Sequence, residues 1–149
     1  MSQQRESTER IELDTSVGYV LKEASSALRV AMEAALRPLG ITVTAYSCLE
    51  LLAHRPGLSS SELARGAFVT RQSMHVLLQS LERDGHLIRA ETAPSGRALP
   101  IRLTASGEEL LGEASAAVRA VEDRMLAGLD GARIRELHAL LRHCAEALG

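Results

Sequence analysis

Four hydrogen-bonding side chains follow one another at the start of a helical pattern: Thr70, Arg71, Gln72 and Ser73. A guanidinium can donate two hydrogen bonds to a guanine edge, and an amide side chain can pair with an adenine edge in a similar way. Hydroxyl groups beside the free N–H groups of a helix start suit a phosphate. A helix that only filled a core would not need this first turn, so the stretch predicts contact with a polar, anionic partner.

The same helix has two different faces. Its apolar residues follow the i, i+3, i+4, i+7 spacing of a buried helical face: Met74, Leu77, Leu78 and Leu81. The opposite face adds His75, Val76 and Gln79 to the polar first turn, and a valine there can touch a thymine methyl group. This face is predicted to enter the major groove of DNA. The alternative is an ordinary solvated helix face.

Two short strands are predicted after this helix, over residues 86–92 and 97–103, around the turn "APSG". Arg89 and Arg97 of this hairpin are further candidate DNA contacts. Arg97 directly follows a glycine at the tip, and a protruding guanidinium suits the narrow, electronegative minor groove. Pro100 cannot donate a backbone hydrogen bond, so the second strand is expected at an exposed edge.

A short helix is predicted ahead of this region. Ser59, followed three residues later by Glu62, is a capping-box pattern that opens a helix carrying Leu63 and Ala64. Ser59 is also included among the candidate DNA contacts. Another helix precedes it, running from an N-cap at Thr42 or Thr44 to about residue 54.

Long helices are predicted at both ends of the chain. The first runs from about residue 15 to 37 and has apolar residues spaced alternately by four and three: Val17, Leu21, Ala24, Leu28, Ala31 and Ala35. A later helix, capped by Thr104, has a face expected to point inward: Leu110, Leu111, Ala114, Val118, Val121 and Met125. The last helix, capped by Asp130, has its own stripe: Ile134, Leu137, Leu141, Cys144 and Leu148.

The order of these elements predicts a fold that is mainly α-helical with a small β-hairpin wing. Helix, short helix, capped helix and hairpin over residues 42–103 form a winged helix-turn-helix lobe. The long helices over 15–40 and 104–149 have more apolar surface than this lobe can cover. We therefore predict that residues 1–149 form a single domain that pairs with a second copy through these helices, although packing on each other within one chain is the alternative.

The charge of the chain is unevenly distributed. The net charge is −2, but residues 54–104 contain seven arginines and four acidic residues, a net of +3. The segments on either side are acidic. Because a phosphate backbone responds to the local field, the middle segment fits a nucleic-acid interface, and the acidic flanks would keep the long helices away from DNA.

Other kinds of chemistry find little support in the sequence. The five histidines form no recognised metal-ligand pattern, and no nucleophile–base pair or phosphate-binding loop of an enzyme is evident. Cys48 and Cys144 could serve a redox-responsive regulator, but both lie on apolar helical stripes, so we expect buried thiols instead. No metal site, cofactor or catalytic residue is predicted.

The segments "LSSSELA", "FVTRQSMHVLLQSLERDGHLIR" and "GRALPIRLTASG" resemble the multiple-antibiotic-resistance regulator (MarR) family of bacterial transcription factors. The resemblance implies a homodimer that binds a pseudo-palindromic operator in double-stranded DNA, usually as a repressor. The family often has an acidic residue shortly before the wing-tip arginine, near the position of Ser95. This departure leaves the wing arginine less firmly held.

The resemblance also implies a small aromatic or phenolic effector that weakens operator binding. Family pockets lie between the dimerisation helices and the DNA-binding lobe, so Tyr19, Met32 and Tyr46 are the candidate effector-binding residues. A winged-helix protein-interaction module without sequence-specific DNA binding is the remaining alternative. Because no secretory signal or apolar membrane span is evident, a cytoplasmic location is expected.

Overall fold

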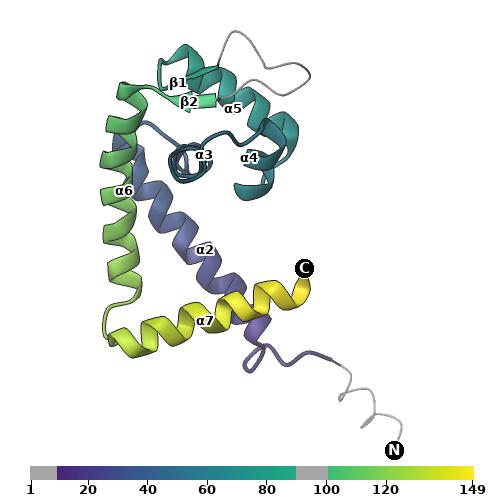
Figure 1. The fold of residues 1–149 in the computed structure, drawn as a ribbon. Helices are drawn as coiled ribbons and strands as arrows, with labels where there is room; N and C mark the ends of the chain where they lie inside the picture. The colour runs from purple at the N-terminus through teal and green to yellow at the C-terminus, as the bar shows by residue number, and fades with distance from the viewer. Residues whose placement is uncertain (1–9, 90–100) are drawn as a thin grey trace, which may run out of the picture.

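The computed structural model describes residues 10–89 and 101–149 (Figure 1). Its elements follow in this order: α2 (Val17–Leu36), the short 3-10 helix η1 (Arg37–Leu39), α3 (Val43–His54), α4 (Ser60–Gly66), α5 (Arg71–Arg83), β1 (Leu87–Arg89), β2 (Ile101–Leu103), α6 (Ala105–Met125) and α7 (Gly131–Leu148). The fold is therefore mainly helical with one two-stranded antiparallel sheet, as the sequence predicts.

Side-chain caps begin the helices where the sequence places them. In each case the side chain of the cap accepts a hydrogen bond from the backbone N–H three residues later, which satisfies one of the free donors of the first turn. The caps are Thr42 for α3, Ser59 for α4, Thr70 for α5, Thr104 for α6 and Asp130 for α7. For α3 the structure selects Thr42 over Thr44.

One aliphatic core holds together the lobe formed by α3, α4, α5 and the two strands. It joins α3, α4, α5, both strands and the first part of α6 through these buried residues: Cys48, Leu49, Leu52, Leu63, Ala64, Met74, Leu78, Leu81, Leu87, Ile101 and Leu111. The predicted inward stripe of α5 is confirmed, since Met74, Leu78 and Leu81 are buried. The chain turns sharply after α5 at Gly85, whose φ of 81° favours glycine.

The two strands pair antiparallel, with Leu87 opposite Leu103 and Arg89 opposite Ile101. Ile101 is buried, Arg102 is exposed and Leu103 is half-buried, so side chains alternate between the core and solvent along the described part of the second strand. The rest of the hairpin, including Pro100, lies outside the described residues.

The long helices extend away from this lobe. Figure 1 shows α2 and α6 packed together where they leave the lobe, while α7 crosses the N-terminal end of α2. Much of their apolar surface is uncovered: Val17 is 75% exposed, and every residue of α7 except Ile134 is exposed. No helix among the described residues has the length and apolar character needed to cross a membrane.

Two predictions about inward-facing residues are wrong for the single chain. Met125 at the end of α6 is 49% exposed, and Cys144 on α7 is exposed. Both lie on apolar stripes that the rest of the described chain, residues 10–89 and 101–149, leaves largely uncovered. Cys48, in contrast, is fully buried as expected.

Candidate nucleic-acid interface

Helix α5 presents its polar first turn to solvent. Thr70 Oγ1 accepts a hydrogen bond from the Ser73 backbone N–H at 3.1 Å and donates one to Ser73 Oγ at 3.0 Å. These bonds fix the start of the helix, and all four residues from Thr70 to Ser73 are exposed. The guanidinium of Arg71 and the amide of Gln72 are thus held on a capped, rigid helix end and are open to a partner.

The exposed face continues along α5 as the sequence predicts. His75, Val76 and Gln79 are exposed, and Val76 is 58% exposed although it is apolar. The buried side of the same helix packs into the core of the lobe. A helix with one buried face and one polar, exposed face that begins with free N–H groups can lie in a major groove.

Helix α4 is fixed by a complete capping box. Ser59 Oγ accepts from the Glu62 N–H at 3.1 Å, and Glu62 Oε1 accepts from the Ser59 N–H at 3.2 Å. The hydrogen bond from the Ser59 backbone holds the pKa of the Glu62 carboxyl below its usual value. Because the Ser59 hydroxyl is already used in the cap and is half-buried, the clearest role of this residue is to orient α4.

Arg89 at the base of the wing contacts α5 rather than only solvent. Its Nε lies 3.4 Å from Glu82 Oε2 near the end of α5, and the Arg89 side chain is only about a quarter exposed. This ion pair ties the first strand to α5, a role that sequence reasoning missed. Arg97, Ser95 and the wing tip lie outside the described residues, so the contact predicted for Arg97 stays a prediction.

A close approach of α6 to the α5–β1 turn joins the wing base to the long helices. Thr104 Oγ1 donates to the Gly85 carbonyl oxygen at 2.6 Å, and Thr104 N–H donates to the His86 carbonyl oxygen at 3.1 Å. A Cβ atom on Gly107 would lie only 2.0 Å from that His86 oxygen. Glycine at position 107 therefore lets the backbones touch.

The two thiols have different environments. Burial raises the pKa of the Cys48 thiol to about 12, so the reactive thiolate is disfavoured at neutral pH. Cys144 is exposed on α7. Within the described residues no three histidine, cysteine or acidic side chains are grouped as a metal site would require.

The three candidate effector-binding residues lie on two helices, α2 and α3. Tyr19 is exposed near the start of α2, Met32 is half-buried further along it, and Tyr46 is half-buried on α3. The Tyr46 hydroxyl donates to Glu50, and burial together with this contact raises the pKa of Tyr46 to about 12. His54 Nε2 lies 3.3 Å from the other oxygen of Glu50.

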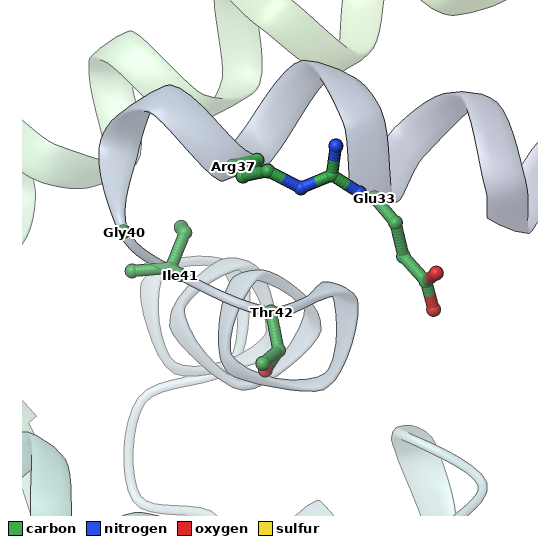
Figure 2. A pocket seen from close by; sticks show the side chains of 5 residues that line it. All are labelled: Glu33, Arg37, Gly40, Ile41 and Thr42. Carbon is green, nitrogen blue, oxygen red and sulfur yellow. The ribbon is translucent and has the colours of Figure 1, made fainter.

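A separate cavity of about 330 Å³ lies where α2 meets α3. Figure 2 shows its lining: Glu33, Arg37, Gly40, Ile41 and Thr42. Glu33 is engaged by Arg29 at 3.1 Å. The lining thus combines the charged side chains of Glu33 and Arg37 with the apolar Ile41, at the junction between a long helix and the lobe, and the Arg37 guanidinium extends toward Glu33 (Figure 2). Sequence reasoning did not identify it, although the helix break at "RPLG" marks the place.

Comparison with known proteins identifies the family. A family model described as MarR family matches residues 39–98. The "HTH-type transcriptional repressor Rv2887" of Mycobacterium tuberculosis is 44% identical over 128 residues, which cover 86% of this chain and 92% of the relative. The chain belongs to the MarR family. The predicted resemblance and the winged-helix fold are therefore confirmed.

Solved structures of this MarR-family relative match the whole layout. Rv2887 in complex with DNA has a TM-score of 0.73 and 41% identity, covering 87% of this chain and 98% of the solved chain. Rv2887 in complex with salicylic acid has a TM-score of 0.73 and 44% identity, covering 91% and 97%.

Proposed function

We propose that this MarR-family protein is a DNA-binding transcriptional repressor, not an enzyme, that acts as a homodimer on a pseudo-palindromic operator in the cytoplasm. The observation that carries the proposal is the exposed first turn of α5, with Arg71 and Gln72 on a capped helix that packs firmly into the lobe. The relative named a transcriptional repressor, which has been solved with DNA, supports the same function.

The contacts divide by their chemistry. Arg71 and Gln72 suit guanine and adenine edges in the major groove, and Val76 suits a thymine methyl group. The hydroxyls of Thr70 and Ser73 and the nearby N–H groups suit phosphates, while His75 and Gln79 extend the same face. We assign Arg97 to the minor groove beside the site, where a guanidinium reads groove width and charge.

Gln72→Ala and Arg97→Ala are expected to change DNA binding in different ways. Loss of a bidentate amide–adenine contact, worth about 1–3 kcal/mol against the wrong base, should relax the preference at one position in each half-site. Loss of a minor-groove guanidinium should instead weaken binding to many sequences and flatten its salt dependence. Binding-site selection from a randomised duplex pool, followed by salt titration on the best site, measures both effects.

Gln79→Ala removes the same amide about two turns further along the same face of α5, so any change that it causes in the selected motif should fall at a different base position from that of Gln72→Ala. An unchanged selected motif for Gln72→Ala would show that Gln72 does not read a base. An unchanged affinity and salt slope for Arg97→Ala would place the wing tip away from DNA.

The long helices support the homodimer. An apolar cavity of about 450 Å³ opens between the start of α2, the end of α6 and α7, lined in part by Val17, Leu21, Met125, Leu137 and Leu141. Exposed apolar surface of this kind is costly in water and is typical of a subunit interface. We assign this surface to the same helices of a second copy, related by two-fold symmetry.

The cavity between α2 and α3 is our candidate effector site. A guanidinium beside an apolar wall suits a small aromatic carboxylate, since the charge pairs with the carboxylate and the wall covers the ring. The relative solved with salicylic acid makes this class the natural probe. A ligand wedged here would alter the angle between α2 and the lobe, and so the spacing of the two recognition helices. Tyr19, Met32 and Tyr46 remain predictions, and none lines this cavity.

Salicylate should release DNA from the wild-type protein but not from Arg37→Ala, whose affinity for DNA without ligand should be unchanged. Fluorescence anisotropy of a labelled operator under salicylate titration measures this. Lys22→Ala, which removes one positive charge from an exposed position on α2, is the control and should respond like wild type. An equal salicylate response in Arg37→Ala would place the effector elsewhere.

A further inference from the structure

The turn between α4 and α5 exposes the only phenylalanine of the chain. Phe68 is 93% exposed, and its φ of 59° makes it the one non-glycine residue with a left-handed backbone among those described. A bulky side chain rarely adopts this conformation, and a fully hydrated aromatic ring gains nothing from folding. Two unfavourable features at one position point to a function for the side chain.

The turn holds this ring in a fixed place. The Phe68 N–H donates to the Arg65 carbonyl oxygen at 3.2 Å, and the Val69 N–H donates to the Ala64 carbonyl oxygen at 3.0 Å. Two residues later Thr70 caps α5. The backbone of Phe68 is therefore anchored on both sides, directly before the turn of helix that carries Arg71 and Gln72.

The charges around Phe68 favour a polyanion as its partner. Arg65 lies three residues before it and Arg71 three residues after it, and both are exposed. Neither guanidinium forms an ion pair within residues 10–89 and 101–149. An exposed apolar ring with an exposed arginine three residues away on each side in the sequence suits DNA, whose phosphates can take the cations while a base edge or sugar meets the ring. A purely apolar protein surface would leave both charges desolvated.

We propose that Phe68 reads the 5-methyl group of a thymine next to the bases contacted by the first turn of α5. Apolar side chains, phenylalanine among them, recognise thymine in the major groove through this methyl group. The inference rests on the proposed DNA-binding function and adds a specificity-determining residue outside the recognition helix. Arg65 and Arg71 would fix the adjacent phosphates and so hold the ring against its base pair.

Phe68→Asn tests this without loss of the fold, because asparagine tolerates a left-handed backbone better than phenylalanine. The variant should melt at the same temperature as wild type or higher. Its affinity for the best duplex selected by the wild-type protein should fall about fourfold or more, the factor for one buried methyl group. Phe68→Leu keeps an apolar side chain and the same backbone strain, and should lose less affinity.

Replacing each thymine of the selected duplex by deoxyuridine, in both half-sites, identifies the contacted methyl group. At one position the change should weaken the wild-type complex by a similar factor and leave the Phe68→Asn complex unaffected. If Phe68→Asn bound the duplex with full affinity, Phe68 would not contact DNA, whether or not the substitution altered the oligomeric state of the protein. If Phe68→Asn weakened binding, and every deoxyuridine replacement weakened the variant complex by the same factor as the wild-type complex, Phe68 would not contact a thymine methyl group. If the wild-type protein selects no sequence, the proposed function fails and this inference fails with it.

Discussion

Gly107→Ala is expected to unfold at a temperature lower by roughly 10 °C, or to fail to fold. The added Cβ atom would lie 2.0 Å from the His86 carbonyl oxygen, which belongs to the backbone and cannot rotate away. Overpacking typically costs about 1–3 kcal/mol, and the upper end applies here because the added atom meets rigid backbone; each kcal/mol shifts the melting temperature by about 2–4 °C in a chain of this size. Thermal unfolding followed by circular dichroism measures the change.

Gly112→Ala is the matched control. It lies on the same helix, is exposed, and has no atom within 4 Å of an added Cβ. Because alanine favours a helix over glycine by up to about 1 kcal/mol, this variant should be as stable as wild type or slightly more so. If Gly107→Ala had the same melting temperature as Gly112→Ala, the start of α6 would not contact the α5–β1 turn as described.

The double variant Leu137→Asp, Leu141→Asp is expected to abolish dimerisation and to reduce operator affinity by about a hundredfold or more. Both leucines line the apolar cavity beside α2, and each introduced carboxylate would have to be buried without a partner. A monomer can bind only one half-site, so it loses the affinity that a dimer gains by binding both half-sites at once. Sedimentation velocity at micromolar concentration and anisotropy with the selected duplex measure the two losses.

Ala139→Asp controls for the charge change and for aspartate within a helix. It lies on the side of α7 opposite the stripe that carries Leu137 and Leu141, and it is exposed. This variant should remain dimeric and bind DNA normally. If the double variant sedimented as a dimer and bound like wild type, the interface would not involve α7.

The sequence predicted well those features that depend on short stretches of chain. Caps such as Ser59, Thr70 and Thr104 were found because the cap and its partner are only three residues apart. The stripe of α5 was found because helical periodicity separates its buried and exposed faces. Both signals are local, and the family resemblance supplied the order of the elements.

Features that depend on distant contacts were missed. The pairing of Arg89 with Glu82 and the approach of Gly107 to His86 join segments that are separated in sequence, and no periodicity reports them. The burial expected for Cys144 was wrong for one chain, because an apolar stripe indicates that a surface is to be covered but not by which molecule. The cavity at Arg37 arises from the angle between α2 and α3.

The direct test of the central claim is selection of duplexes by the wild-type protein from a randomised pool, read by sequencing and repeated at two salt concentrations. A symmetric dimer with α5 in the major groove should enrich one inverted repeat whose half-site centres lie about one helical turn, roughly 10 base pairs, apart. Binding should weaken as salt rises, while preference for this repeat over other sequences should persist. Enrichment of no motif, with equal binding to all duplexes or to none, would contradict sequence-specific repression, and binding to none would favour a winged-helix module that binds other proteins.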